Sequence, residues 1–186
     1  IAPSPAQIKA IDKNLGTVER FSKSDVQSAA GVRSFEGECA AAYFAAWQGL
    51  QIEWKSTTRR PIPDEWRRFT SRSSLANGVK PKNVNASHPV NAMLNYAYAV
   101  KLAHLQIQAI ADGYDPTIGI LHQGRLGQPA FVFDLIEPER PKVDAVILGF
   151  VQSRSFSSAD FIIRRDGVCR LSPQLARMIA TIASAT

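Results

Sequence analysis

Three side chains in the run from Gly113 to Pro141 have the types and spacing of a metal-binding group. His122 precedes a carboxylate pair, Asp134 and Glu137, whose members are three positions apart. Residues at i and i+3 lie on one face of a helix, so a helical segment would place both carboxylates on the same side. An imidazole and carboxylates that face one pocket can bind a divalent ion such as Mg²⁺ or Mn²⁺. The run therefore predicts divalent-metal chemistry.

The secondary structure around this pair is ambiguous from the sequence. The segment FVFDLIE, residues 131–137, is rich in residue types that favour strands. The i, i+3 carboxylates and the EPERP that follows favour a helix instead, ended before Pro141. The helical alternative is the one that lets both carboxylates serve one site.

Three helices ahead of this run are expected to position it. Residues 6–27 form a polar helix with a broken apolar stripe, and residues 26–50 form an Ala-rich helix containing GECAAAYFAAW. A third helix, residues 90–112, begins after a proline and ends at Gly113. Glu36 is expected near the head of the second helix, where the helix dipole favours an acidic side chain.

Towards the C-terminus, the segment DFIIRRDGVCRL predicts a β-hairpin, because two β-prone runs flank Asp166-Gly167. Asp-Gly favours a tight type I′ turn. Ser172-Pro173 then caps a last helix through about Ala183. The fold class expected is mainly α, a single helical domain over residues 1–186 with a small β-hairpin near its end.

Between residues 55 and 82, eight basic residues face only two acids, and Trp54, Trp66 and Phe69 are interleaved with them. Arginines with aromatics suit phosphate contacts and base stacking. The alternative is a solvated loop whose aromatics fill the core. The predicted phosphate-binding residues here and downstream are Arg59, Arg60, Arg67, Arg68, Arg72, Arg125 and Arg140.

The composition is that of an ordinary globular domain with a basic balance. The 186 residues carry a formal net charge of +6 and a pI of about 9.6, which favours a polyanionic partner and equally suits a merely basic enzyme. Two cysteines are too few for a disulfide framework, so a reducing cytoplasm is expected. The sequence has neither the apolar run of a membrane span nor a secretion signal. Because it lacks an initiator Met, we expect either an excised part of a longer protein or an unusually short natural one.

Three blocks, in order, resemble the CRISPR-associated integrase/endonuclease of spacer acquisition, the Cas-one family. SFEGECAAAYFAAW resembles its Glu-Gly-x-x-Ala-x-x-Tyr helix, and PVNAMLNYAYAV resembles its Asn-x-x-Leu-Asn-Tyr-x-Tyr helix. GYDPTIGILHQGRLGQPAFVFDLIEPERP resembles its Gly-x-x-Pro-x-x-Gly-x-x-His and Asp-Leu-x-Glu-x-x-Arg-Pro segment. The blocks span about residues 32–144 and indicate the family's C-terminal catalytic domain, without its N-terminal β-rich domain.

The resemblance implies Glu36, His122 and Glu137 as ligands of Mg²⁺ or Mn²⁺, with Asp134 as a further catalytic acid. Glu38 is the rival to Glu36, but it follows the glycine of the motif rather than preceding it. The implied activity is that of a metal-dependent DNA endonuclease/integrase, which joins short DNA duplexes into a repeat array by transesterification. The implied partners are double-stranded DNA, a second copy of the chain in a homodimer, and a small Cas-two protein.

Other functions remain open on the sequence alone. One is a catalytically silent DNA-binding or assembly module of the same fold. Another is a transposase-like integrase of the same superfamily that acts on transposon ends. A third is an unrelated α-helical enzyme in which His122 and Glu137 are structural.

Overall fold

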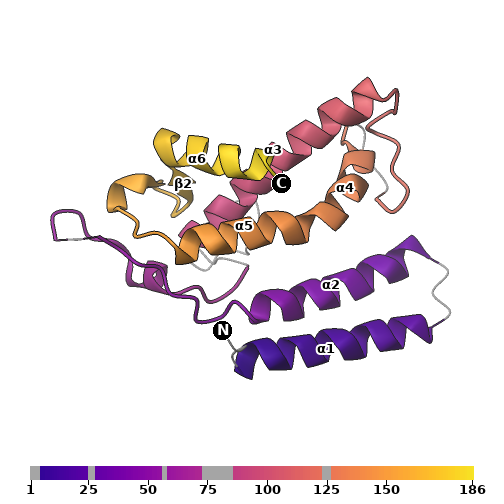
Figure 1. Ribbon diagram of the computed structural model, residues 1–186, viewed down its shortest axis with the longest axis horizontal. Helices are drawn as coiled ribbons and strands as arrows, with labels where there is room; N and C mark the ends of the chain where they lie inside the picture. Colours follow the sequence, from indigo (N-terminus) through magenta and orange to yellow (C-terminus); the bar gives the residue numbers. More distant parts are fainter. Residues whose placement is uncertain (1–4, 25–27, 56–57, 73–85, 123–126) are drawn as a thin grey trace. The chain divides into compact units, whose positions relative to one another are not determined.

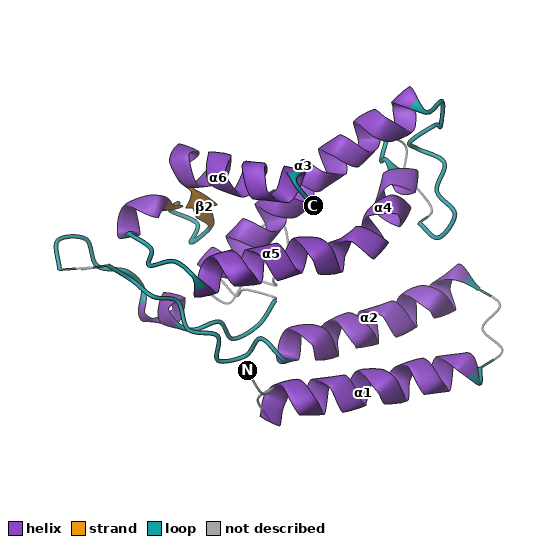
Figure 2. Ribbon diagram, in the orientation of Figure 1, coloured by secondary structure: helices purple, strands orange, loops and turns teal. Residues whose placement is uncertain are grey.

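The structure is a computed structural model that describes residues 5–24, 28–55, 58–72, 86–122 and 127–186. It divides into two compact units, Ile1–Leu50 and Gln51–Thr186. Helices dominate the described residues (Figure 2), and a two-stranded sheet lies near the C-terminus. The prediction of a mainly α fold with a small β-hairpin near the C-terminus is therefore confirmed. Among the described residues, no helix is long and apolar enough to cross a membrane.

The first unit is a pair of helices, α1 (Pro5–Ser22) and α2 (Ala29–Ala45), that pack side by side (Figure 1). Small buried side chains let them approach closely, and at one end Phe21 meets Phe35 edge-on at 4.9 Å. The side chain of Ser28 caps α2 by accepting from the Gly31 N–H. Both helices are shorter than predicted, and the Ser28 cap accounts for the later start of α2.

Glu36 lies in the middle of α2 and is exposed. The prediction that it stands near the head of the helix was wrong, since the first turn of α2 contains no acidic residue. The helix dipole therefore does little for this side chain. Its neighbour Glu38 forms an ion pair of 2.6 Å with Arg20 of α1.

The second unit is built around α3 (Pro89–Ala111). Against it pack α4 (Ala130–Ile136), α5 (Arg140–Gln152) and α6 (Pro173–Ser184). Figure 1 shows α4 near the end of α3 and the hairpin near its beginning. The largest fully buried side chains of the unit are Phe69, Phe156, Met93, Leu94, Ile136, Ile147, Leu175 and Ile179.

The segment with ambiguous secondary structure is helical. Val132 and Ile136 are both fully buried one turn apart, so tertiary packing overrides the strand propensity of FVFDLIE. Beyond α4 the chain tightens into the 3₁₀ turn η2 (Glu137–Glu139) and continues directly into α5. The prediction that the helix ends before Pro141 was therefore wrong. Pro141 lies in the first turn of α5, where its missing N–H is tolerated.

The predicted hairpin is present as β1 (Phe161–Ile163) and β2 (Cys169–Leu171), paired antiparallel. Its turn differs from the expected type I′. The Arg164 N–H donates to the Val168 carbonyl, so three residues lie between this pair, and Gly167 takes a φ of 78°. That is the pattern of a three-residue loop with glycine in the left-handed region.

The aromatics of the basic stretch belong to the core. In η1 (Asp64–Arg67), Trp66 is 3% exposed and donates its indole N–H to the Ser87 carbonyl at 2.8 Å. Phe69 is fully buried, and Trp54 stacks on Trp66 at 5.9 Å. The base-stacking alternative therefore does not apply to Trp66 or Phe69 in this structure.

Candidate functional site

The loop between α3 and α4 has a shape that glycines make possible. Gly113 ends α3 with a φ of 84°, a conformation that other residues rarely adopt. Asp115 accepts from the backbone N–H of Thr117 at 2.8 Å, which closes the next turn. At Gly119, a Cβ would collide with the His122 carbonyl oxygen and lie 2.8 Å from the Cβ of Ala130. The loop therefore lies directly against the start of α4.

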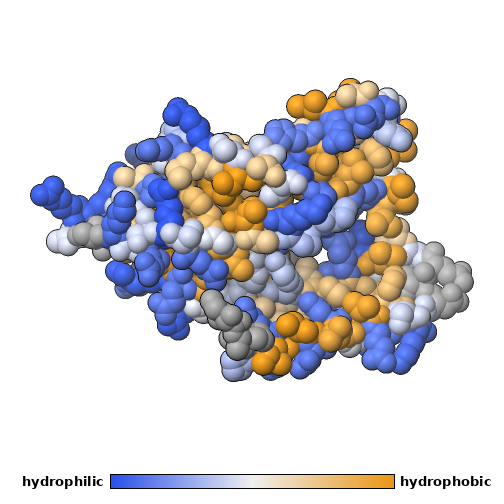
Figure 3. Space-filling model, in the orientation of Figure 1, coloured by the Kyte–Doolittle hydropathy of each residue, from blue (hydrophilic) through white to orange (hydrophobic). Residues whose placement is uncertain are grey.

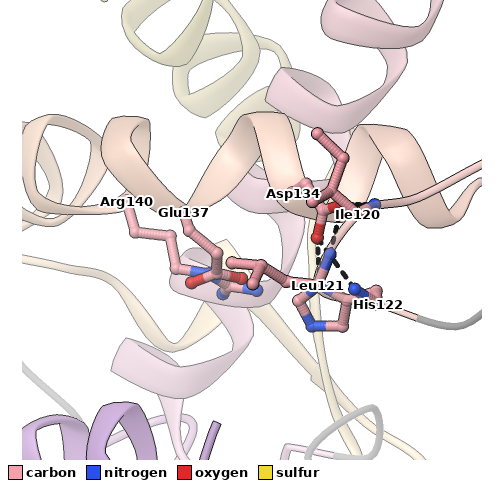
Figure 4. Close-up of polar contacts among 6 residues, drawn as sticks. All are labelled: Ile120, Leu121, His122, Asp134, Glu137 and Arg140. Carbon is pink, nitrogen blue, oxygen red and sulfur yellow. Dashed lines mark hydrogen bonds and ion pairs between the residues drawn. The ribbon is translucent and has the colours of Figure 1, made fainter. Parts of the chain in front are cut away.

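One carboxylate of α4 holds the end of this loop. Asp134 accepts the backbone N–H groups of Ile120 at 2.5 Å, Leu121 at 3.0 Å and His122 at 3.0 Å. Its Oδ1 also lies 2.7 Å from Nδ1 of His122. Figure 4 shows these four contacts converging on the two carboxylate oxygens. Both oxygens of Asp134 are thus used inside the protein.

The same contacts keep Asp134 ionised. Partial burial favours its neutral form, but the hydrogen bonds from His122 and from the three backbone N–H groups outweigh burial and lower the pKa of the carboxyl. A carboxylate can only accept at Nδ1, so the His122 proton resides on Nδ1. In the neutral imidazole, Nε2 then presents a lone pair. This is the arrangement by which a carboxylate orients a metal-ligating histidine.

Glu137 lies on the side of the α4–η2 helix that faces the His122 loop, and Leu121 lies between the Glu137 and His122 side chains (Figure 4). Its carboxylate pairs with Nε of Arg140 at 2.8 Å, and 22% of its side chain is exposed. The Arg140 guanidinium lies over the ring of Tyr98, 4.8 Å from the centroid. The two predicted carboxylates therefore differ: Asp134 is enclosed by donors, whereas Glu137 faces one cation and solvent.

A buried polar network lies under Arg140 and was not foreseen as part of the site. The Tyr98 hydroxyl donates to Asp144, which is 3% exposed. Burial, and then the Asp144 charge, raise the pKa of Tyr98 well above its ordinary value. Arg72 also lies over the Tyr98 ring and bonds Oδ1 of Asn95 at 2.6 Å. The network packs α3 against α5 and so supports the Glu137 region.

From the sequence, Asn91, Asn95 and Tyr98 lie near one stripe of the helix and were expected to hydrogen-bond one another or a substrate, or equally to be satisfied polar groups where helices pack. The structure places Asn91 at 0% exposure, where its amide donates to the Ser71 carbonyl at 2.9 Å. Asp144 had no signal of its own in the sequence. It lies one turn beyond Arg140, and that i, i+4 spacing was the only available hint.

Glu36 belongs to the first unit, and His122 and Glu137 belong to the second. Within either unit, the described residues contain no group of three or more His, Cys, Asp or Glu side chains that could hold a metal. The structure thus brings together His122 and Asp134, with Glu137 one turn beyond. A complete ligand set with Glu36 stays a prediction.

The predicted phosphate-binding arginines fall into different environments. Arg59, Arg60 and Arg68 are exposed, and Arg67 makes only a loose ion pair of 3.6 Å with Asp64. Figure 3 shows a hydrophilic surface at the end of the second unit where residues 58–61 lie. Arg125 lies outside the described residues.

Comparisons with known proteins give the site a family. The chain matches the family described as CRISPR associated protein Cas1 over residues 4–183. It is 29% identical over 157 residues to a CRISPR-associated endonuclease Cas1 1 of Methanospirillum hungatei, covering 84% of this chain and 41% of that protein. It is 31% identical over 169 residues to a Cas4/Cas1 fusion of Rhodospirillum rubrum, covering 90% of this chain and 26% of that protein.

A solved structure titled "Casposase bound to integration product" shares the fold, with a TM-score of 0.73 and 25% identity. The alignment covers 92% of this chain and 45% of the casposase chain. The chain thus spans under half the length of each of these three proteins. The match over nearly its whole length shows that the chain belongs to the CRISPR-associated Cas1 family.

Proposed function

We propose that this chain is the catalytic part of a metal-dependent DNA integrase/endonuclease, which joins short DNA duplexes into a CRISPR repeat array. The observation that carries the proposal is the hydrogen bond between Asp134 and Nδ1 of His122. It orients the imidazole and leaves the lone pair of Nε2 for a ligand, in the region that also holds the half-buried Glu137.

The residues present fit a divalent ion. His122 through Nε2 and the carboxylates of Glu137 and Glu36 would hold it, because an imidazole and carboxylates suit Mg²⁺ or Mn²⁺. When bound, the ion polarises a phosphodiester and assists the attacking and leaving oxygens. Glu137 would then exchange its ion pair with Arg140, and the freed guanidinium would stay within reach of a DNA phosphate.

The chain's own residues supply orientation and charge. Asp134 orients the His122 ring. The Tyr98 ring, held by its hydrogen bond to Asp144, packs against the guanidinium of Arg140. Arg59, Arg60, Arg67 and Arg68 form an exposed basic surface for phosphates. We leave Arg72 out of this surface, because its guanidinium is half-buried and bonded to Asn95.

The test is a strand-transfer and nicking assay on DNA with Mn²⁺ or Mg²⁺. Glu36→Ala, His122→Ala and Glu137→Ala are each expected to abolish activity and to leave DNA binding mostly intact. Two matched controls remove the same negative charge outside the proposed site. Glu38→Ala removes the carboxylate that pairs with Arg20, and Glu139→Ala removes the carboxylate that pairs with Lys101 and Lys142. Wild-type activity of His122→Ala, or loss of activity in both controls, contradicts the proposed site.

DNA binding is tested separately. Reversing the charge at Arg67 and Arg68 together is expected to weaken binding and to lower the slope of log affinity against log salt by about 2. An unchanged slope would show that this surface is merely solvated. We further propose that the protein acts as a homodimer with a small Cas-two partner, which size measurement of a reconstituted mixture tests.

A second candidate is an integrase that acts on transposon ends, and the casposase likeness favours it. The chemistry would be the same, so only the DNA distinguishes the two. Preference for a repeat-containing target and short duplexes supports the first function. Preference for one particular terminal sequence on the donor supports the second.

A further inference from the structure

The central helix α3 has an apolar face that is exposed to solvent. Five of its side chains recur about one turn apart on the same side of the helix, because their positions follow the helical period. All five are exposed, and Ile107 and Ile110 keep 67% and 55% of their surface in water. We name this face the α3 stripe; its residues are Tyr96, Ala99, Ala103, Ile107 and Ile110.

The opposite side of α3 is the side on which the second unit packs. Leu94, Tyr98 and Ala109 are buried there, and α4, α5 and α6 all contact the helix. A surface helix ordinarily has polar side chains opposite its buried face. In α3 both sides are apolar, and Figure 3 shows hydrophobic residues gathered over its C-terminal end. A contiguous apolar face of this kind marks a surface for association.

The α3 stripe carries no charge, although the whole chain has a net charge of +6. Lys101 is the one lysine, arginine, aspartate or glutamate of α3, and it pairs with Glu139 at 3.1 Å, away from the stripe. His104 borders the stripe, and two exposed acids, Asp112 and Asp115, follow the end of the helix. DNA would therefore find no cation on this face for its phosphates, and a strongly charged protein would find no opposite charge.

The sizes of the side chains match when one α3 stripe is laid antiparallel on a second one. A two-fold axis at Ala103 places position 99 against position 107 of the other copy, and position 96 against position 110. The small Ala99 then meets the large Ile107, and Ala103 meets its own copy, so the helices can approach closely at the centre. Tyr96 meets Ile110 at both ends, where crossed helices lie further apart.

A parallel pair of stripes would not match. Ile107 would meet Ile107 at one level and Ala99 would meet Ala99 at another, which crowds the first level and leaves a gap at the second. The two copies of Asp112 would also lie side by side. In the antiparallel pair they lie at opposite ends, about 27 Å apart at the rise of an α-helix. Salt screens like charges at that separation.

We propose that the α3 stripe binds the α3 stripe of a second copy of this chain, antiparallel, across a two-fold axis at Ala103. This deepens the homodimer of the proposed function by stating where the copies meet, and it rests on that function only for the second copy. One pair of helices covers less than the roughly 800 Å² per partner of a standard interface. We therefore expect the stripe alone to give a dissociation constant of roughly 10–100 μM.

The first experiment measures sedimentation of the chain without DNA or metal, over a concentration range that brackets this constant. The wild type is expected to pass from monomer to dimer. Ile107→Glu is expected to raise the dissociation constant at least about tenfold, because dimerisation would bury a carboxylate against apolar groups. Ile107 is exposed in the single chain, so the fold does not depend on it.

The matched control is Gln108→Glu, which adds the same charge to the next exposed position, about 100° further round the helix. Its dissociation constant should stay within about twofold of the wild type. Equal effects of Ile107→Glu and Gln108→Glu would show that added charge, rather than the stripe, governs association, and would overturn the proposal.

A second variant separates a specific fit from general stickiness. Ala103→Leu adds apolar surface at an exposed position, but it places two leucines where two alanines meet on the axis. A specific antiparallel pair should therefore weaken, by about tenfold. Association that grows stronger with Ala103→Leu would mean that the stripe is merely sticky, and would overturn the proposal.

The axis itself is tested by cross-linking in a chain that carries Cys39→Ser, since the other natural cysteine, Cys169, is 1% exposed. Under mild oxidation, Ala103→Cys should form a disulfide with its own copy, because two residues on the axis lie within disulfide reach. Ala99→Cys should not, because its two copies would lie about 12 Å apart along the helix axis. Cross-linking of Ala99→Cys and not of Ala103→Cys would overturn the proposed register.

Three further results overturn the inference and differ from failure of the proposed function. A chain that stays monomeric at every concentration has no such interface. A dimer that persists in Ile107→Glu has its interface elsewhere, and the homodimer of the proposed function then stands. Loss of binding to the small Cas-two partner in Ile107→Glu, with the chain itself monomeric, would assign the stripe to that partner. None of these measurements depends on Mn²⁺-dependent cleavage.

Discussion

Two histidines, one before α3 and one in the loop after it, use the same ring atom in opposite ways. His88 caps α3, and its Nδ1 accepts the Val90 N–H at 3.2 Å, so its proton resides on Nε2. The His122 Nδ1 instead donates to Asp134. The His88 side chain is buried at 6% exposure, whereas 29% of the His122 side chain is exposed. The partner at Nδ1 therefore decides whether Nε2 carries a proton or a lone pair, and burial decides whether Nε2 can be reached.

The two histidines therefore have different roles: His88 stabilises the start of α3, and His122 belongs to the candidate site. Burial lowers the pKa of His88 to about 4, which keeps it neutral at the pH where its helix must stay capped. His122 lies in a loop that gains its order from one carboxylate rather than from a packed core.

The largest effect is expected from exchanging the two histidines for alanine. His122→Ala should lower the proposed metal-dependent cleavage by more than about 100-fold, with little change in stability, because it removes a proposed metal ligand and few packing contacts. His88→Ala should keep the activity of folded molecules and lower the free energy of unfolding by about 2 kcal/mol, through loss of a cap and a buried ring. Nicking assays and urea denaturation distinguish the two. If the variants lose activity and stability in parallel, the contrast is wrong.

The next effect concerns Asp134. Asp134→Asn keeps the size of the side chain but removes its charge, so the His122 proton is no longer held on Nδ1. Cleavage should fall about 10-fold to 100-fold while DNA binding persists. Asp115→Asn is the matched control in the same loop, because an amide oxygen can still accept the Thr117 N–H. Comparable activity of the two variants would show that Asp134 does not orient the imidazole.

The stability of the second unit should depend on pH through His88. Its pKa is about 4 in the folded protein and near 6.5 in the unfolded chain, so the unfolded chain takes up a proton first as pH falls. Stability is fully present above pH 6.5 and is lost as pH falls towards 4; the loss between pH 7 and 5 is about 2 kcal/mol. His88→Asn should remove this loss, whereas exchange of the exposed His104 for Asn should retain it. Urea denaturation at both pH values measures the difference.

The smallest effect is expected at Gly119. Gly119→Ala places a methyl group against the His122 carbonyl and Ala130, so the loop must shift, at a cost of about 1–2 kcal/mol. Cleavage should fall together with stability, because the shift moves His122. Gly149→Ala in α5 is the control, since a Cβ there meets nothing within 4 Å, and it should be neutral or stabilising. Equal behaviour of the two alanines would mean that the loop adapts without moving His122.

Parts of the site were accessible from the sequence because they are local. The Gly113-to-His122 motif predicted a loop ending in an imidazole, and the i, i+3 pair predicted two carboxylates near one helical face. The contact between Glu137 and Arg140 has the same short spacing and was available to the same reasoning. The helix over residues 90–112 and the hairpin near the C-terminus were likewise predicted from local patterns.

What could not be predicted depends on contacts between distant residues. The helix over FVFDLIE was predicted only from the spacing of its carboxylates, against its strand propensity; the burial of Val132 and Ile136, which stabilises that helix, was not predicted. The Tyr98–Asp144 pair joins residues 46 positions apart, and Trp66 in the core donates its N–H to the carbonyl of Ser87, 21 positions away.

Motifs and helical periodicity are properties of neighbouring positions, so the candidate site residues, the helices that carry them and the family could all be predicted from the sequence. The tertiary structure alone decided the roles of the two carboxylates. Asp134 meets four donors because the loop folds back over α4, and Glu137 faces an arginine and solvent because α4 tightens into η2. Hydrogen bonds and burial set the charge and tautomer of a site, and both depend on which distant groups the fold brings within about 3 Å.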